Sequence, residues 1–248
     1  MRIIDVSGNY DTTQNITTMK KIILLFLTIA TITVNGQNHL LGIKCGTSRT
    51  QVKDNNFTES ISLKRGFRKG LSFGLTYDYL FKKYFIAGAD IIYNQRGYIN
   101  EYQSTNGLGN PVGEVLITKY FYDYITVPIK VGFIYGKTFY GFINICMNPS
   151  ILINAKTISP TTQYIQIQGY IIPSSKPPNP KNANKFDFGG LYEIGCGYKF
   201  KKNLWLFTSL SYQQSFTSIT NSKYIPNDEI KHFGMTVNLG LKCALKKE

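Results

Sequence analysis

The stretch that decides the fold is Phe233–Leu245, which reads FGMTVNLGLKCAL. Apolar residues occupy every second position from Phe233 to Leu245, and the positions between them hold mainly glycine, threonine, asparagine and lysine. Successive side chains of a strand point to opposite faces, so a period of two predicts a β-strand with one apolar and one polar face.

Strand-like segments recur throughout the chain upstream of this one. They are Leu41–Gly46, Leu71–Tyr79, Phe85–Asn94, Ile125–Phe133, Phe139–Ile153, Phe186–Lys199 and Leu204–Tyr212. The segment Phe139–Ile153 is apolar on both faces, so the pattern does not orient it. With 14% aromatic residues the composition favours β-structure, and 17% charged residues is too few for a disordered polyelectrolyte. We therefore predict an all-β fold of about eight strands.

Short and long connections alternate strictly between these segments. The short ones are Phe81–Tyr84, Tyr135–Thr138 and Phe200–Asn203, and the long polar ones are about Thr50–Arg68, Asn100–Lys119, Ala155–Lys185 and Ser218–Lys231. This alternation is typical of an outer-membrane barrel, which has brief periplasmic turns and longer extracellular loops. The prediction is an eight-stranded antiparallel up-and-down transmembrane β-barrel.

The two faces of the segments differ in polarity. The polar face is rich in glycine and carries single charges near mid-strand, at Lys44, Asp78, Asp90, Lys130, Glu193 and Lys242. The apolar rows carry no charge, and a charge there would be costly against lipid. We expect the apolar face to contact lipid and the charges to neutralise one another in a filled lumen. The alternative is a soluble secreted barrel with its faces inverted.

Aromatic residues gather near both ends of the predicted strands. Beside the short turns lie Tyr77, Tyr79, Tyr84, Phe85, Tyr135, Tyr198 and Phe200; toward the long loops lie Tyr93, Tyr98, Tyr120, Tyr122, Tyr124, Tyr212 and Phe233. We interpret them as two belts of rings at the level of the lipid headgroups.

The N-terminal region has the pattern of a secretory signal peptide. Met19-Lys20-Lys21 precedes an apolar run over Ile22–Ile32, and small or narrow residues stand at Val34 and Gly36. The run is too short to cross a bilayer as a helix. We expect cleavage after Gly36, which divides the chain into an extension and signal peptide over residues 1–36 and a barrel domain over residues 37–248. Met19 is a better translation start than Met1, because residues 1–18 upstream of it are polar.

Several stretches resemble one family. They are Leu41–Gly46, Asp90–Gly97, Tyr124–Lys130 and Gly195–Phe200, together with the leader ending at Gly36-Gln37. In this order they are similar to the PorT-like outer-membrane β-barrel domain proteins of Bacteroidota, often labelled porin family. The resemblance implies an outer-membrane barrel, with some relatives tied to secretion or gliding machinery. Cys45 departs from the family, in which small residues are usual at that position.

The chain carries no recognisable catalytic, cofactor or metal motif. GxSxG, P-loop, HExxH and dinucleotide patterns do not occur, and we expect no catalytic, cofactor-binding or metal-binding residues. The sequence offers one possible catalytic arrangement, in which His232 acts with Ser215 or Ser218 and with Asp228 or Glu229. The second histidine, His39, is expected at the opposite membrane face and so cannot share a site with His232. We predict a protein that is not an enzyme.

The four cysteines leave two pairings open. Cys45 and Cys243 fall on the apolar faces of the first and last strands, which pair to close the barrel. They form either a disulfide, which needs a Cα–Cα distance of about 4.4–6.8 Å, or two free thiols facing lipid. Cys146 and Cys196 lie on neighbouring strands with undecided faces.

The net charge of +14 points to an anionic partner. Basic residues cluster in the first long loop at Lys53, Lys64, Arg65, Arg68 and Lys69, and in the third at Lys176, Lys181 and Lys185. At that height they would contact lipopolysaccharide phosphates, whereas a nucleic-acid site would need basic and aromatic residues converging on one groove. The prediction is a non-enzymatic surface protein that contacts outer-membrane lipid, lipopolysaccharide or an envelope protein, and no nucleic acid. The alternatives are a small-solute porin and a lipid A-modifying enzyme.

Overall fold

The structure is a computed structural model that describes residues 38–54, 63–159, 165–167, 170–172, 183–201, 203–220 and 229–245. The predicted signal peptide and the proline-rich part of the third long loop lie outside these residues. Among the described residues, no helix is long and apolar enough to span a bilayer.

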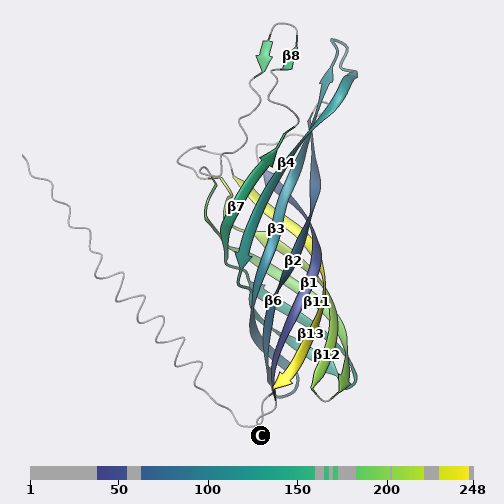
Figure 1. The fold of residues 1–248 in the computed structure, drawn as a ribbon, viewed down its shortest axis with the longest axis vertical. Helices are drawn as coiled ribbons and strands as arrows, with labels where there is room; N and C mark the ends of the chain where they lie inside the picture. The colour runs from purple at the N-terminus through teal and green to yellow at the C-terminus, as the bar shows by residue number, and fades with distance from the viewer. Residues whose placement is uncertain are drawn as a thin grey trace, which may run out of the picture. The chain divides into compact units, whose positions relative to one another are not determined.

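Five of the barrel walls are single long strands (Figure 1). They are β1 (Asn38–Asp54), β2 (Leu63–Phe81), β3 (Phe85–Thr105), β12 (Leu204–Ser215) and β13 (Ile230–Leu245). Their length and their alternation of buried and exposed residues confirm the strand prediction for these segments.

The three remaining walls are each built from two strands in line. They pair β4 (Pro111–Thr126) with β5 (Ile129–Gly136), β6 (Phe139–Met147) with β7 (Ser150–Ile158), and β10 (Phe186–Asp187) with β11 (Gly189–Lys201). Two interruptions coincide with Pro128 and Pro149, because proline has no N–H to donate to a neighbouring strand. Hydrogen bonds still cross them, from Val127 N to Pro149 O (2.9 Å) and from Asp90 N to Pro128 O (3.0 Å).

The walls close into a ring of eight. Going round, the order is β1, β2, β3, β4 with β5, β6 with β7, β10 with β11, β12 and β13, and every neighbouring pair is antiparallel. The ring closes where β1 pairs with β13 over a register from His39↔Leu245 to Asp54↔Ile230. The predicted eight-stranded antiparallel barrel is therefore confirmed. The short strands β8 (Ile165–Ile167) and β9 (Tyr170–Ile172) form a separate two-stranded sheet.

One end of the barrel carries the short turns, as predicted. The β2–β3 turn is made by Lys82 and Lys83 in the left-handed region, with φ values of 48° and 67°. The β5–β6 turn follows Gly136, with φ 121°. Figure 1 shows these turns and the end of β13 together at the lower end.

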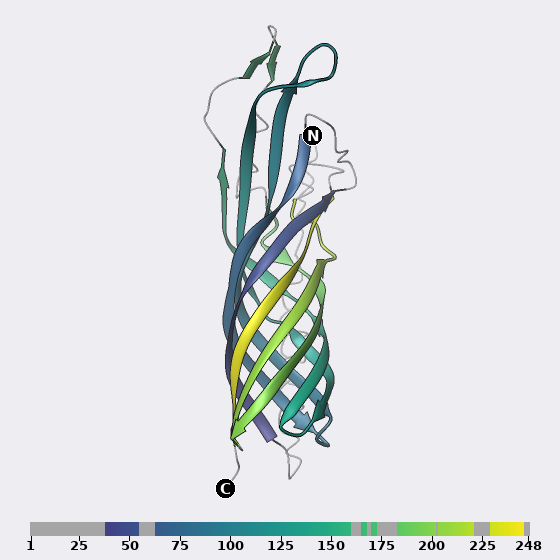
Figure 2. The same cartoon turned by 90° about the vertical axis from the view of Figure 1, so that its right-hand side faces the viewer.

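At the other end the strands run further than the sequence predicts. Asn100–Lys119 was expected to be a long loop, but β3 and β4 stay paired as far as Thr105↔Pro111 and turn over residues 106–110. In Figure 2 this hairpin rises beyond the barrel wall. The prediction was wrong because a paired strand in water needs no apolar face, so the alternation that marks strands in lipid fades there. The same holds for parts of Thr50–Arg68, where β1 reaches Asp54 and β2 begins at Leu63.

The apolar face points outward. Val237 and Leu239 are each 55% exposed, whereas Lys130 and Glu193 on the polar face are 2% and 4% exposed. The alternative of a soluble barrel with inverted faces is wrong. The structure also orients β6, which the sequence could not: Tyr140, Phe142, Asn144 and Cys146 point inward, and the residues between them point outward.

The lumen is filled in three layers. An apolar layer lies beside the short turns, a charged layer at mid-height and a tyrosine-rich layer toward the long connections. The apolar layer holds Leu40, Leu80, Ile86, Ile134, Tyr140, Phe142, Trp205 and Phe207. Inward glycines on the neighbouring strands make room for its rings, since a Cβ at Gly195, Gly197 or Gly240 would overlap Phe142, Tyr140 or Phe207 respectively.

Candidate functional site

The six predicted mid-strand charges meet in the middle of the lumen. Lys130 on β5 lies at its centre, with its Nζ 2.6 Å from Asp78 Oδ1 and 2.6 Å from Asp90 Oδ1. Lys44 on β1 lies 2.6 Å from Asp90 and 3.7 Å from Glu193. Lys242 on β13 lies 2.5 Å from Asp78. Alternating parity therefore predicted the inward direction of all six side chains correctly.

This charged layer is neutral overall, because three ammonium groups face three carboxylates. All six side chains are 7% exposed or less. Burying such charges is unfavourable unless they are paired and further hydrogen-bonded. Here Thr76 accepts from Lys130 (2.8 Å), and Asn144 and Ser209 donate to Glu193 (2.8 and 2.9 Å). Each ammonium and each carboxylate of the layer is therefore in at least one ion pair.

The charged layer rests on the apolar layer. The Lys242 ammonium lies 4.2 Å from the centre of the Phe207 ring and 5.3 Å from that of Phe142. These are cation–π contacts in a desolvated setting, where such contacts are strongest. Together the two layers close the lumen from the short-turn end to mid-height.

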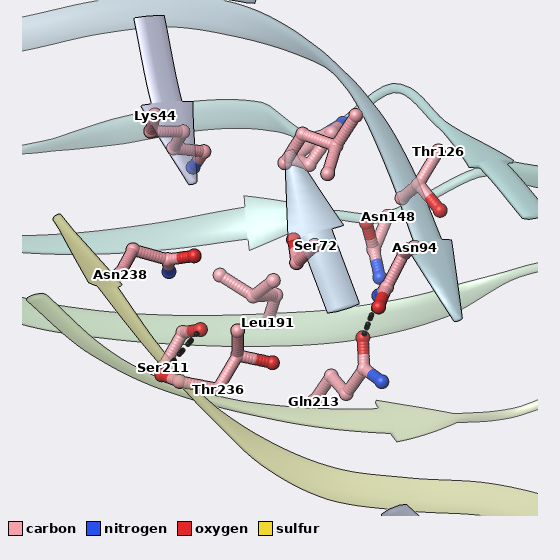
Figure 3. Close-up of a pocket in the computed structure, with 12 residues that line it drawn as sticks. Lys44, Ser72, Asn94, Thr126, Asn148, Leu191, Ser211, Gln213, Thr236 and Asn238 are labelled. Carbon is pink, nitrogen blue, oxygen red and sulfur yellow. Dashed lines mark hydrogen bonds between the residues drawn. The ribbon is translucent and has the colours of Figure 1, made fainter. Parts of the chain in front are cut away.

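A small cavity lies next to the charged layer, on the side of the long connections (Figure 3). Its volume is about 20 Å³, and Lys44, Asn94, Asn148, Gln213 and Asn238 are among its lining residues. Asn94 donates to Gln213 at 3.2 Å. Within the part of the chain that the structure describes, Asn94 Oδ1, Asn148 Oδ1, Asn238 Oδ1 and Gln213 Nε2 have no protein hydrogen-bond partner. A polar cavity of this size holds one water molecule and is too small for an organic solute.

A second ion pair lies nearer the long connections. Arg96 on β3 donates to Asp187 on β10 at 2.6 Å, and also to Ser150 (3.0 Å) and Thr126 (3.2 Å). Ser215 donates to the same carboxylate at 2.8 Å. This cluster ties together five walls of the barrel near the proline breaks.

Tyrosine rings and a histidine form the third layer, and they correct the belt prediction. Tyr98, Tyr120, Tyr122 and Tyr124 were expected at the lipid interface, but all four are buried inside the barrel. The reason is parity: Ile125 and Tyr93 point outward, so residues an odd number of positions away from them point inward. Tyr98 and Tyr120 stack with centroids 4.4 Å apart. The position of these tyrosines beside a long loop in the sequence therefore did not indicate that they contact lipid.

The residues of the possible catalytic arrangement around His232 do not come together as a site. His232 is fully buried against Tyr122 and Tyr124, with ring centroids 5.2 and 5.8 Å away. Ser215 is bonded to Asp187, and Ser218 to Thr220 (2.8 Å). Glu229 pairs with Lys231 at 2.8 Å, and Asp228 lies outside the described residues. His39 pairs with Leu245 and His232 with Val52, so the prediction that they lie at opposite ends is confirmed.

All four cysteines are free. Cys45 is opposite Leu239 and Cys243 is opposite Leu41, so the two thiols are four residues out of register and no disulfide joins them. The alternative of free outward thiols holds. Cys146 is buried in the lumen while Cys196 is exposed outside, which excludes their pairing as well. Among the described residues, no three histidine, cysteine or acidic side chains come together in a way that could hold a metal ion.

The basic residues of the first long connection differ in exposure. Lys53, Lys64 and Lys69 are exposed, as predicted. Arg68 is instead buried, and its guanidinium lies 4.1 Å from the centre of the Phe121 ring. Arg65 pairs with Asp54 at 3.3 Å. Sequence reasoning missed Arg49, an exposed residue on β1 directly opposite Lys69. The sequence does indicate that Arg49 points outward, because it continues the outward row of Cys45 and Thr47.

A closed barrel with an apolar outer wall is a membrane-spanning barrel. Its exposed apolar rows run round the ring on every wall, which is far more than a soluble monomer presents to water. The family model described as "Outer membrane protein beta-barrel domain" matches residues 35–221. The chain belongs to this family and is an outer-membrane β-barrel protein.

The chain is similar to solved structures of outer-membrane proteins at low sequence identity. OprG from Pseudomonas aeruginosa is 10% identical, with 86% of this chain and 97% of that chain covered and a TM-score of 0.44. Ail, the attachment invasion locus protein of Yersinia pestis, is 13% identical, with 83% and 98% covered and a TM-score of 0.36. The outer membrane protease OmpT from Escherichia coli is 8% identical, with 87% and 99% covered and a TM-score of 0.41. No curated protein is significantly similar in sequence.

Proposed function

We propose that this chain is a non-enzymatic surface protein of the outer membrane, which presents its long connections to lipopolysaccharide and to an envelope protein. In the same proposal it is a PorT-like barrel of Bacteroidota, with residues 1–36 as an extension and cleaved signal peptide and residues 37–248 as the barrel domain. The quoted motifs and their order support this finer assignment.

The filled lumen is the observation that carries the proposal. The charged layer is neutral and closed from below by the apolar layer, and the cavity above it has a volume of only about 20 Å³. The small-solute porin needs a continuous water path that these layers do not leave. The lipid A-modifying enzyme needs His232 beside a serine, whereas the histidine is packed among tyrosines.

The β3–β4 hairpin is the part of the surface best suited to a protein partner. Leu108 at its tip is 87% exposed, and Val112, Val115 and Ile117 are each at least 40% exposed. The hairpin that carries these residues rises beyond the barrel wall (Figure 2), and β4 pairs with β7 only from Lys119 onward. Apolar residues gathered on a projecting hairpin are typical of an interaction site.

Site-specific photo-crosslinking in intact cells tests the proposal. A photoreactive residue at Leu108 or Val115 should give an adduct with an envelope protein, whereas one at the lipid-facing Leu239 should give no protein adduct. Purified wild type should also show no channel steps in a planar bilayer. Channel steps, or the absence of a protein adduct from both hairpin positions, would overturn the surface role.

A further inference from the structure

The outward face of β1 changes character at Arg49. The four outward residues nearer the short turns, from Leu41 to Thr47, carry no charge. Thr47 lies between Leu71 and Val237, which belong to the apolar rows that face lipid. One step further along, Arg49 lies directly opposite Lys69 of β2, and both side chains are exposed. This pair therefore stands at the boundary between acyl chains and headgroups.

The pair is uncompensated. Within the described residues, neither Arg49 nor Lys69 takes part in an ion pair, and like charges directly opposite on neighbouring strands are destabilising. In the lumen, by contrast, each inward lysine of the charged layer has a carboxylate within 2.6 Å. The positive charge of Arg49 and Lys69 is thus displayed on the outside, where an anion can reach it.

Aromatic side chains hold the arginine in place. The Arg49 guanidinium lies 5.1 Å from the centre of the Phe67 ring. Phe67 in turn meets Phe233 edge to face at 5.8 Å, so strands on both sides of β1 support the same guanidinium. Stacking occupies one face of the guanidinium plane and leaves its N–H edge free for an oxyanion.

We propose that Arg49 and Lys69 bind a phosphate group of an outer-leaflet glycolipid. Arg49 donates two N–H groups to the phosphate and Lys69 adds a point charge beside it. The glycolipid's acyl chains lie on Leu71 and Val237 below, and Phe67 and Phe233 lie at headgroup height. This inference rests on the outer-membrane position in the proposed function and not on its protein partner.

Titration of a lipid with two phosphates tests the site. The full mature barrel is placed in nanodiscs of zwitterionic lipid, and bound diphosphorylated lipid A is measured by native mass spectrometry. The double variant R49Q/K69Q should bind about 10- to 30-fold more weakly than wild type, because each interfacial cation contributes on the order of 1 kcal/mol. The matched control K83Q/K137Q removes two charges from the short-turn end and should bind like wild type.

Further arms identify the ligand and guard against misfolding. Dephosphorylated glycolipid should bind wild type and R49Q/K69Q equally weakly, and excess inorganic phosphate should not displace lipid A. The charge-preserving R49K/K69R should retain most binding, which shows that the barrel is intact. Equal lipid A binding by wild type and R49Q/K69Q would overturn the proposal, and so would displacement by inorganic phosphate. Neither result bears on the hairpin adducts, so the two proposals fail separately.

Discussion

At the residue scale, Lys130 is the side chain on which the lumen depends most. Its ammonium touches Asp78, Asp90 and Thr76, and its side chain is almost completely buried. Sequence alternation predicts that it points inward, but it does not predict its partners. Those follow from the register, since Gly88 on β3 pairs with Lys130, and Gly88 also pairs with Asp78 of β2.

Replacing Lys130 with methionine should destabilise the barrel by about 3–5 kcal/mol, because two buried carboxylates then lose their shared cation. The measurement is the free energy of unfolding in detergent with urea. Lys137→Met, which removes an exposed charge at the β5–β6 turn, is the control and should change little. Adding Asp90→Asn to Lys130→Met should recover part of the loss, and no recovery would contradict the pairing described here.

Cysteine chemistry gives a second prediction at this scale. Wild type and Cys45→Ser should run identically on gels with and without reductant, because no two thiols are within bonding reach. A maleimide should label Cys146 only after unfolding, since it is buried in the lumen. A reductant-dependent shift that Cys45→Ser abolishes would mean that the β1–β13 register is wrong.

At the element scale, β6 and β11 show why the sequence could not orient one wall. The inward row of β6 includes Tyr140 and Phe142, which belong to the apolar layer, so both of its faces are apolar. The clue lay on another strand, where Gly195 and Gly197 leave space for these two rings. A pattern read along one strand does not report which residues of the neighbouring strand pair with it. The offset between Cys45 and Cys243 on the neighbouring strands β1 and β13 could not be predicted for the same reason.

Gly197→Ala should lower the stability of the barrel by about 1–3 kcal/mol, because the new Cβ overlaps the Tyr140 ring and the neighbouring backbone. Cys196→Ala, one residue away on the outward face, is the matched control. Both variants can be compared by the temperature at which the folded form unfolds on a gel. Equal temperatures would show that the inner wall has more room than described.

The β3–β4 hairpin should be dispensable for folding. It projects beyond the barrel wall, and the ring below it is complete without the residues between Tyr102 and Leu116. Replacing residues 103–115 with a short turn should leave the thermal stability within experimental error and abolish the adduct expected at the tip. A variant that fails to insert would show that the hairpin takes part in closing the ring.

At the scale of the whole molecule, the alternation of short and long connections and the outward apolar rows were enough to predict an eight-stranded barrel. What the sequence missed lies beyond the barrel wall, where β3 and β4 remain strands without a strict alternation of apolar and polar residues. The buried Tyr120, Tyr122 and Tyr124 were also missed, although counting parity from Ile125 places them inside. Lipid imposes a pattern that can be recognised in the sequence, and water does not.

The closed lumen makes a prediction for the molecule as a whole. Wild type in a planar bilayer should show no stepwise conductance at moderate voltage, and Phe207→Ala should also stay silent, because the charged layer still blocks the path. A variant that weakens both layers, Phe207→Ala with Lys130→Ala, is expected to admit ions. Steps from wild type would show that the layers rearrange in the membrane.

The ion pairs straddle the joint between the first and last strands. Lys242 on β13 reaches past β1 to Asp78 on β2, and Lys44 on β1 contacts Glu193 on β11, from which β12 and β13 separate it in the ring. These contacts exist only once the N-terminal and C-terminal strands have met. In a half-assembled sheet, these lysines and carboxylates would be without partners on the inward face, which is buried when the barrel closes. Insertion into the bilayer should therefore proceed in a single concerted step, with no stable open intermediate.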